Sequence, residues 1–173
     1  KLHIQATTDQ LTGIFNRRVV FDALDEAMDK ANESQDREFT TIMFDIDFFK
    51  QVNDTYGHAG GDAVLISFAK LLESEIASPN IVGRIGGEEF LAILYLNQDQ
   101  AAEFCKKLII KINDNTVNFD GIDIKISSSG GVAFSSETNT SADLTNKADE
   151  RLYEAKKSGR NRFKLIDSEL VGD

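Results

Sequence analysis

Residues 83–96, GRIGGEEFLAILYL, contain two apolar segments on either side of a pair of glycines and a pair of glutamates. Paired glycines are typical of a two-residue β-hairpin turn, in which both central positions take a positive φ. We therefore predict two short antiparallel strands that meet at Gly86-Gly87. Glu88 and Glu89 would then place two like charges side by side at the hairpin tip, which calls for a physical reason.

The remaining segments alternate between helical and extended patterns. Helices are predicted where apolar residues recur at helical spacing, and strands where β-branched or alternating apolar residues dominate. The helices are expected at 19–34, 61–77 and 98–114, with a last helix that runs through 148–158, and the strands are expected at 39–47, 81–85, 88–96, 121–134 and 161–166. Ser141 is expected to be the N-cap of the last helix, and Gly159 to follow its C-terminus. This order predicts a single α/β (α+β) domain of βαββαβ type with an extra helix in front.

Composition limits the classes of function. The chain has 173 residues, of which 41% are hydrophobic and 28% charged, and its net charge is -10. That charge disfavours nucleic-acid and anionic-membrane partners, although a phosphate-bearing small molecule can still bind with the help of a metal ion. No apolar segment reaches the ~18 residues of a membrane-spanning helix. The single cysteine, Cys105, favours a core position and a reducing environment.

Carboxylates at one end of the sheet form the first candidate site. In a βαββαβ sheet the first strand lies antiparallel to the third, so Asp45, at the end of the strand at 39–47, should face Glu88. Clustered carboxylates raise one another's pKa unless a cation lies between them. A small wet cleft with oxygen ligands suits Mg²⁺, which is usually shared with substrate phosphates. Alternatively, Glu88 and Glu89 only solubilise the hairpin tip and Asp45 caps a strand; the glutamates alone do not decide between the two.

The stretch DIDFFKQVNDTYGHAGGD, residues 45–62, adds further polar groups at the same end of the sheet. They are Asp45 and Asp47, which are expected to share a face, the cation Lys50, and the polar residues Asn53, His58 and Asp62. Singly, Asn53 is explained as a turn former, His58 as a hydrogen-bonded loop residue and Asp62 as a helix N-cap. For His58 this ordinary explanation is at least as strong as a functional one. Their accumulation at one sheet end favours a single site.

Five blocks of the sequence resemble the GGDEF family, the diguanylate cyclases. In order they are DQLTGIFNRR (9–18), DIDFFK through GGD (45–62), GRIGGEEF (83–90), ISSSGGVA (126–133) and ADERLYEAKKSGRNR (148–162). GGEEF is an accepted variant of the family signature. The resemblance implies a palm-like domain, similar to nucleotidyl cyclases and ferredoxin-like folds, with a mixed central sheet flanked by helices. It also implies condensation of two GTP into cyclic di-GMP with release of two pyrophosphates.

The resemblance also divides the chain and assigns roles to matching positions. Residues 1–8, which begin without Met, are expected to be the end of an upstream linker or signalling helix, and residues 9–173 the GGDEF domain. Asp45, Glu88 and the backbone carbonyl of Ile46 would bind Mg²⁺, or Mn²⁺ in its place, and Glu88 is also the candidate base for the attacking 3′-hydroxyl. Lys50, Lys156 and Arg160 would stabilise charge on the phosphates, and Asn53, His58 and Asp62 would bind the guanine or its sugar. Lys156 and Arg160 have an alternative explanation, because the helix dipole favours cations at a helix C-terminus.

Partners follow from the same resemblance. Each domain binds one GTP, so turnover requires a second copy of the same domain, and an upstream sensory domain would control that assembly. No nucleic-acid partner and no direct membrane contact of this segment are expected, and the expected location is the cytoplasm, including the cytoplasmic part of a membrane-bound protein. Two other functions stay open: a catalytically silent module that binds GTP or cyclic di-GMP, and a cyclase with a mixed or adenine product, against which Asp62 argues.

A product-inhibition site is expected to be absent. Many members of the family carry Arg-x-x-Asp ending five residues before the signature, where a product dimer binds. The corresponding residues here are Ala77, Ser78, Pro79 and Asn80, which carry neither charge. We therefore expect no capture of cyclic di-GMP at this position, because the bidentate arginine contact is missing.

Overall fold

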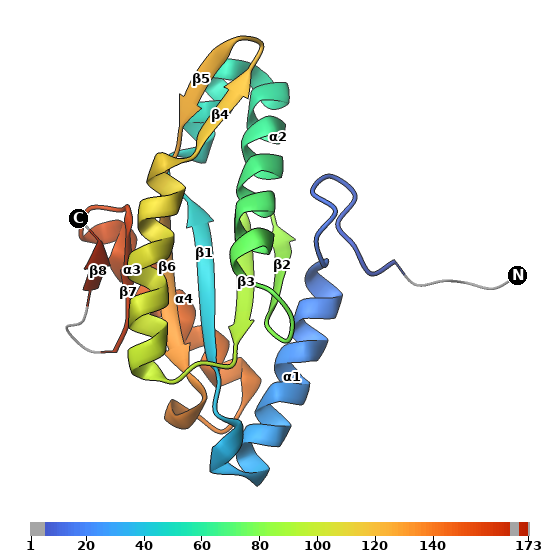
Figure 1. Cartoon of the computed structure of the whole chain (residues 1–173), viewed down its shortest axis with the longest axis vertical. Helices are drawn as coiled ribbons and strands as arrows, with labels where there is room; N and C mark the ends of the chain where they lie inside the picture. The colour runs from blue at the N-terminus through green and yellow to red at the C-terminus, as the bar shows by residue number, and fades with distance from the viewer. Residues whose placement is uncertain (1–5, 167–169, 173) are drawn as a thin grey trace, which may run out of the picture.

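The structure, a computed structural model, describes residues 6–166 and 170–172. Within these residues the centre is a six-stranded mixed sheet with the order β2-β3-β1-β6-β7-β8 (Figure 1). Its strands are β1 (Thr40–Ile46), β2 (Ile81–Gly86), β3 (Glu89–Leu94), β6 (Ser128–Phe134), β7 (Arg162–Lys164) and β8 (Leu170–Gly172). β1 is antiparallel to both β3 and β6, whereas β6 is parallel to β7.

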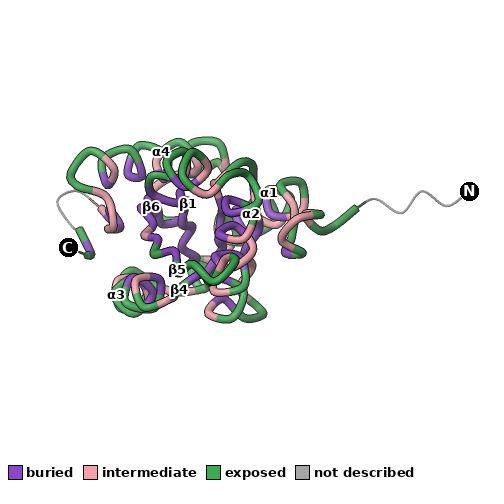
Figure 2. The backbone as a smooth tube through the Cα atoms, turned by 90° about the horizontal axis from the view of Figure 1, so that it is seen from above, coloured by how far each residue is buried: buried purple, intermediate pink, exposed green. Residues whose placement is uncertain are grey.

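Helices cover both faces of this sheet. They are α1 (Arg17–Glu33), α2 (Phe49–Glu75), α3 (Gln98–Asp114) and α4 (Ser141–Lys157), with short 3-10 helices η1 (Gln35–Arg37) and η2 (Ser135–Glu137). α1 and α4 pack on one face, and α2 and α3 on the other. Seen from above, α4 and α3 lie on opposite sides of the buried strands β1 and β6 (Figure 2). β1, α2, β2, β3, α3 and β6 form the predicted βαββαβ core, so the α/β (α+β), palm-like fold with its mixed sheet is confirmed.

The central strand β1 is buried along its whole length. Because side chains alternate between the two faces of a sheet, Ile42, Phe44 and Ile46 pack against α2 and α3, whereas Met43 packs against α1 and α4. Asp45 therefore lies on the same face as Met43. Its carboxylate emerges toward α4, at the end of the sheet where β1 stops.

The second helix is longer than predicted. α2 begins at Phe49, twelve residues before the expected start at 61, and bends at Gly57, whose φ of 77° and ψ of 174° are non-helical. The first arm has low helix propensity because it is rich in Asn, Asp, Thr and Gly, but Val52 is buried and Phe49 packs against the core, so tertiary packing stabilises it. Asn53 and Asp62 lie inside the helix, so the turn-former and N-cap explanations for them are wrong.

The strand predicted at 121–134 is two strands. β5 (Ile122–Lys125) pairs with β4 (Thr116–Phe119) in a separate hairpin that projects beyond the main sheet (Figure 1), and only β6 joins the main sheet. The alternation of Ile122, Ile124 and Ile126 is typical of a strand, but it does not specify which neighbour the strand pairs with. β4 and β8 were not predicted from the sequence.

The N-cap of α4 is Thr140, one residue before the expected Ser141. The Thr140 hydroxyl accepts a hydrogen bond from the backbone N–H of Asp143. At the other end Gly159 follows the C-cap residue Ser158 with a φ of 135°, as predicted. Helix α4 therefore ends where the sequence indicates, close to the residues expected at the site.

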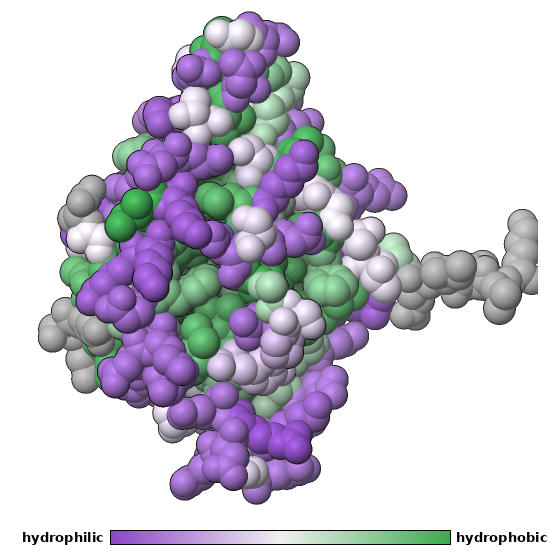
Figure 3. Space-filling view, in the orientation of Figure 1, coloured by the Kyte–Doolittle hydropathy of each residue, from purple (hydrophilic) through white to green (hydrophobic). Residues whose placement is uncertain are grey.

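The outer surface carries most of the charge. On the face covered by α2 and α3, hydrophilic side chains form most of the outline and apolar ones gather near the middle (Figure 3). None of the helices in the described part of the chain is both long and apolar enough to span a lipid bilayer.

Gly131 in β6 is required by the close packing of α4. A Cβ atom at this position would overlap the backbone carbonyl oxygen of Ala148 and the amide nitrogen of Leu152. We expect Gly131→Ala to lower the free energy of unfolding by about 3 kcal/mol, the upper end of the usual cost of overpacking, because backbone atoms cannot rotate away. Urea unfolding measures this change.

Gly61→Ala is the matched control for that substitution. Its Cβ atom would meet the side-chain oxygen of Asn53, which can move, and alanine is the better helix former. We expect its free energy of unfolding to stay within about 1 kcal/mol of the parent. Equal losses in the two variants would contradict the packing argument.

Candidate active site

The turn between β2 and β3 carries the two glutamates. Gly86 pairs with Glu89, so the central turn residues are Gly87 and Glu88 and not the predicted Gly86-Gly87. Gly87 has a φ of 49°, which glycine adopts without strain. A register shift between Arg84 and Gly86 marks a β-bulge beside the turn. The bulge leaves Ile85 as the extra residue of β2 beside the turn.

Arg84 joins this turn to the N-terminal segment. Its Nε donates to the carbonyl oxygen of Gly87 at 2.9 Å, and its guanidinium lies 3.2 Å from the Asp9 carboxylate. Burial raises the pKa of Asp9, but hydrogen bonds from Thr12 and from the Arg84 guanidinium outweigh it and keep that pKa below its ordinary value. The DQLT block is therefore part of the support of the turn.

Of the upstream segment expected at 1–8, residues 1–5 lie outside the described residues. The carbonyl oxygen of Ala6 accepts hydrogen bonds from the side chains of Asn16 and Arg18. Thr8 forms a β-bridge with Phe15. Residues 6–8 therefore contact the residues around the start of α1.

Asp45 is a buried carboxylate, 6% exposed, near the end of β1. The residue directly opposite on β3 is Glu89, and not Glu88 as expected. Glu88 is one position further into the turn, where its carbonyl oxygen accepts a hydrogen bond from the Ile46 N–H at 3.3 Å. Its side chain still lies near enough to act on Asp45 electrostatically. Three carboxylates therefore gather where β1 ends.

These carboxylates are incompletely neutralised. Burial raises the pKa of Asp45, and repulsion by Glu88 and Asp47 adds to the rise, which the Lys156 ammonium opposes. Burial also raises the pKa of Glu89, together with repulsion by neighbouring carboxylates that include Asp45. A bound cation would relieve this repulsion.

Lys156 reaches the carboxylates from the last turn of α4. Its Nζ lies 2.8 Å from the Oδ2 atom of Asp45. A cation placed only to complement the helix dipole would not need such a partner. The structure thus brings Lys156 together with Asp45, whereas its assignment to the phosphates, which the resemblance implied, stays a prediction.

The donor set fits a hard divalent cation. Asp45 and Glu88 offer carboxylate oxygens beside the backbone of Ile46, and their mutual repulsion favours positive charge between them. Within residues 6–166 and 170–172, no three His, Cys, Asp or Glu side chains converge closely enough to bind a metal ion unaided. A cation here would take its other ligands from the backbone, water and substrate phosphates, which is typical of Mg²⁺.

The bend of α2 carries the residues expected to bind the base. Asn53 lies on the first arm, and His58 and Asp62 follow the bend on the second arm. The side-chain oxygen of Asn53 lies against Gly61, where a Cβ atom would overlap it. Asn53 is half-buried, whereas His58 and Asp62 are exposed. Asn53 and Asp62 therefore flank the bend, and the missing side chain at Gly61 makes room for the side chain of Asn53.

Lys50 and Arg160 border the same end of β1. Lys50 is exposed on the first turn of α2, directly after the strand. The Arg160 guanidinium lies over the ring of Phe48, 4.6 Å from its centre, in a cation–π contact. Both cations thus lie around the junction of β1 and α2.

Two contributors were missed from the sequence. Glu89 had no assigned role, and no sequence signal places it opposite Asp45, because the β2–β3 turn does not fix the register between β1 and β3. Asp47 was noted only for its spacing from Asp45, yet it accepts hydrogen bonds from the Ser127 and Ser129 hydroxyls. No sequence signal indicates these partners, because they lie 80 and 82 residues away in the chain.

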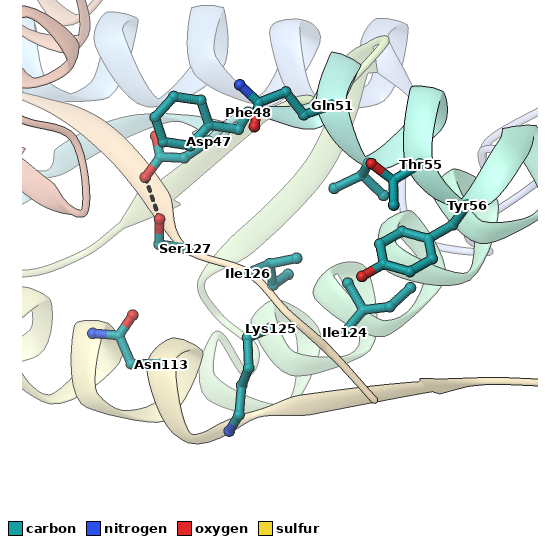
Figure 4. A pocket seen from close by; sticks show the side chains of 11 residues that line it. Asp47, Phe48, Gln51, Thr55, Tyr56, Asn113, Ile124, Lys125, Ile126 and Ser127 are labelled. Atoms are coloured by element: carbon teal, nitrogen blue, oxygen red, sulfur yellow. Dashed lines mark hydrogen bonds between the residues drawn. The ribbon is translucent and has the colours of Figure 1, made fainter. Parts of the chain in front are cut away.

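A pocket of about 480 Å³ lies beside Asp47 (Figure 4). It is lined by one side of the first arm of α2, by the end of β5 and the segment that joins it to β6, and by the end of α3. None of the residues expected at the metal or nucleotide site lines it. The pocket therefore adjoins the cluster of carboxylates and cations at the hairpin turn through Asp47 and Phe48 but includes none of the residues expected to bind metal or nucleotide.

Comparison with known proteins identifies this arrangement. A family profile described as "Diguanylate cyclase, GGDEF domain" matches residues 6–162. The chain belongs to the GGDEF domain family. Diguanylate cyclase DgcS of Shewanella oneidensis is 36% identical to this GGDEF domain over 98% of the chain and 56% of that protein. Diguanylate cyclase A of Treponema denticola is 36% identical over 95% of the chain and 45% of that protein, so the domain spans about half the length of these relatives.

Solved structures agree with the family assignment. The GGDEF domain of DgcB from Caulobacter crescentus, in complex with c-di-GMP, matches with a TM-score of 0.87 at 30% identity, over 95% of this chain and 98% of that one. Diguanylate cyclase SiaD from Pseudomonas aeruginosa, in complex with its activator SiaC, matches with a TM-score of 0.87 at 33% identity, over 93% of this chain and 62% of that one. The fold of this GGDEF domain is therefore that of its family.

Proposed function

We propose that this GGDEF domain is a diguanylate cyclase that condenses two GTP into cyclic di-GMP and releases two pyrophosphates. The observation that carries the proposal is the intact signature turn between β2 and β3, which lies at the end of β1. There the Glu88 carboxylate repels the buried Asp45 carboxylate, and the Lys156 ammonium lies beside Asp45. Relatives named diguanylate cyclases, at 36% identity, support it.

In this mechanism the chain binds a divalent cation, Mg²⁺ or Mn²⁺, through Asp45, Glu88 and the carbonyl of Ile46. When bound, the cation supplies positive charge to the reacting phosphate oxygens. Glu88 accepts the proton of the 3′-hydroxyl as that oxygen forms a bond to the α-phosphate and pyrophosphate leaves. The negative charge on the phosphates is stabilised by Lys50, Lys156 and Arg160.

The base is proposed to bind at the bend of α2. Asn53 and Asp62 flank the bend, and the missing side chain at Gly61 allows the Asn53 amide to lie between the two arms. A carboxylate at Asp62 can accept hydrogen bonds from the N1–H and the N2 amino group of guanine, and adenine offers neither donor along that edge. His58, exposed on the second arm, is proposed to assist with the base or its sugar.

Turnover is proposed to need two copies of the domain. Each copy binds one GTP, and the 3′-hydroxyl of one nucleotide must reach the α-phosphate of the other. An upstream sensory or dimerising segment would control this assembly; among the relatives, DgcB has a coiled coil and SiaD an activator, SiaC. We place the reaction in the cytoplasm, where GTP is available, without a nucleic-acid partner or direct membrane contact of this domain.

A product assay tests the proposed function. The chain, fused to a dimerising coiled coil, is incubated with GTP, with ATP, and with an equimolar mixture of both. Cyclic di-GMP from GTP alone is the expected result. A mixed product would indicate a different base specificity, and GTP binding without any product would favour the catalytically silent module.

Product inhibition through Ala77–Asn80 should be absent. The Asn80 side chain already accepts a hydrogen bond from the Tyr95 N–H at 2.8 Å, and the Asn80 N–H donates to the Ala77 carbonyl oxygen at 3.0 Å. Because the segment has no arginine, it lacks the guanidinium group that could make a bidentate contact with a phosphate. We expect calorimetric titration of the domain with micromolar cyclic di-GMP to show no binding here.

The double substitution Ala77→Arg and Asn80→Asp is the matched comparison, because it restores both charges of the family motif. This variant should gain product binding. Tight binding to the parent chain that disappears when Asn80 is changed to alanine would contradict the prediction.

A further inference from the structure

The loop that joins α4 to β7 carries Arg160 in an uncommon backbone conformation. Gly159, Arg160 and Asn161 have positive φ values of 135°, 63° and 50°. A positive φ is ordinary for glycine, but Arg160 and Asn161 have a Cβ atom that crowds the backbone there. Two such residues in succession persist only where surrounding contacts hold them.

Hydrogen bonds from two directions hold this loop. At the end of α4 the Arg160 N–H donates to the Ala155 carbonyl oxygen at 3.0 Å, which closes the helix as a Schellman motif. One residue later the Asn161 N–H donates to the Oδ2 atom of Asp47 at 2.9 Å. This second bond joins the loop to the end of β1, 114 residues away in the chain.

Asp47 is itself fixed in position. It is 4% exposed, and the hydroxyls of Ser127 and Ser129 each donate to its carboxylate at 2.6 Å; the bond from Ser127 is drawn in Figure 4. Its backbone N–H donates to the Ser127 carbonyl oxygen at 2.9 Å. The carboxylate is therefore a buried acceptor anchored to β1 and β6.

The loop in turn decides where the Arg160 side chain lies. The guanidinium lies over the Phe48 ring. Phe48 directly follows Asp47 in the chain; its φ is 56°, and it is 52% exposed. Asp47 thus connects both partners of the cation–π contact. Its backbone leads into Phe48, and its carboxylate holds the loop that presents Arg160.

We propose that Asp47 is a positioning residue for Arg160. The inference rests on the proposed function, in which Arg160 binds the phosphates of GTP. By accepting the Asn161 N–H, Asp47 holds Arg160 in its left-handed conformation over Phe48, so the guanidinium is in place before the nucleotide arrives. Such pre-organisation raises affinity, because the loop and side chain are ordered already on folding.

Affinity for 3′-deoxy-GTP tests this role, because the analogue lacks the attacking hydroxyl and binds without turnover. We expect Asp47→Ala and Arg160→Ala each to weaken binding by about tenfold or more, as for a lost charge-assisted hydrogen bond. In the double variant the second substitution should add less than about twofold, because both remove the same contact. If the double variant instead lost affinity by the product of the two single losses, the proposal would be overturned.

Asp47→Asn should restore binding. Its amide oxygen can accept from Asn161 and Ser127 while its NH₂ group donates to the Ser129 hydroxyl. We expect an affinity within about threefold of the parent, since the hydrogen bond to the loop is kept. An asparagine variant as weak as the alanine variant would overturn the positioning role, because the loop contact alone would then not be sufficient.

Hydrogen exchange of the Asn161 amide tests the same contact without nucleotide. Exchange should be at least about tenfold faster in Asp47→Ala than in the parent or in Asp47→Asn. If the parent binds 3′-deoxy-GTP and this exchange is unchanged in Asp47→Ala, only the positioning role is overturned. If the parent does not bind 3′-deoxy-GTP, the proposed function and the positioning role are both overturned.

Asn161→Pro breaks the contact from the loop side, in case Asp47→Ala does not fold. Proline has no N–H and cannot adopt a φ of 50°, and this position is half-exposed, outside the core. The variant should bind 3′-deoxy-GTP as weakly as Arg160→Ala does. Ser158→Ala, in the same loop, leaves the Asn161 N–H in place and should bind like the parent; a loss equal to that of Asn161→Pro would overturn the proposal.

Discussion

Asp45→Ala is expected to reduce cyclic di-GMP formation by at least about 10³-fold while the domain stays folded. The substitution removes one of the two carboxylates proposed to bind the cation. It also removes the partner of Lys156, whose Nζ lies 2.8 Å from the Asp45 carboxylate. Product formation at saturating Mg²⁺, with the chain held as a dimer, measures the loss.

The same substitution should not lower stability at neutral pH. The pKa of Asp45 is raised in the folded protein above its ordinary value of 3.8, chiefly by burial. A raised carboxyl pKa means that the folded state binds the proton more tightly, so the stability from this group is present at low pH and is lost as pH rises through the folded pKa. Urea unfolding of Asp45→Ala should therefore match or exceed the parent at neutral pH, with the difference shrinking toward pH 3.8.

Glu88→Ala is also expected to reduce cyclic di-GMP formation by at least about 10³-fold, because Glu88 is the second proposed ligand and the proposed base. Glu150→Ala, an exposed carboxylate on α4, is the control and should keep full activity. Activity of Asp45→Ala or Glu88→Ala within a few-fold of the parent would remove that residue from the mechanism.

Asp62→Ala is expected to reduce the preference for GTP over ATP by about 10² or more. The carboxylate can accept two hydrogen bonds from guanine, and each charge-assisted bond is worth roughly 1.5–3 kcal/mol. Asp62 lies inside the second arm of α2 and not at a helix N-terminus, so its loss removes no helix cap. Binding of GTP and ATP to the variant, measured by calorimetry, gives the preference directly.

Asp54→Ala, an exposed carboxylate on the first arm of the same helix, is the matched control and should keep the preference for GTP. If Asp62→Ala bound GTP as tightly as the parent and gained no tolerance for ATP, the guanine contact would have to be assigned to another residue.

Local patterns predicted most of the elements that build the sheet. The buried strand at 39–47 and the helix at 98–114 were predicted because apolar periodicity depends only on neighbours along the chain. The first arm of α2 was not predicted, because its polar and glycine-rich residues have low helix propensity and only packing of Phe49 and Val52 in the core holds them. The prediction of one strand at 121–134 was wrong for a related reason, since alternation does not specify the neighbouring strand.

The sequence by itself determined the family, the order of the βαββαβ core and the residues expected at the site, because signature residues stand at fixed places in the chain. Only the tertiary structure decided that Glu89, and not Glu88, lies opposite Asp45, that Lys156 reaches that carboxylate, and that Asp47 binds the loop of Arg160. These contacts join residues 44 to 114 positions apart. They depend on strand register and on how α4 packs against the sheet, which no local pattern of residue types encodes.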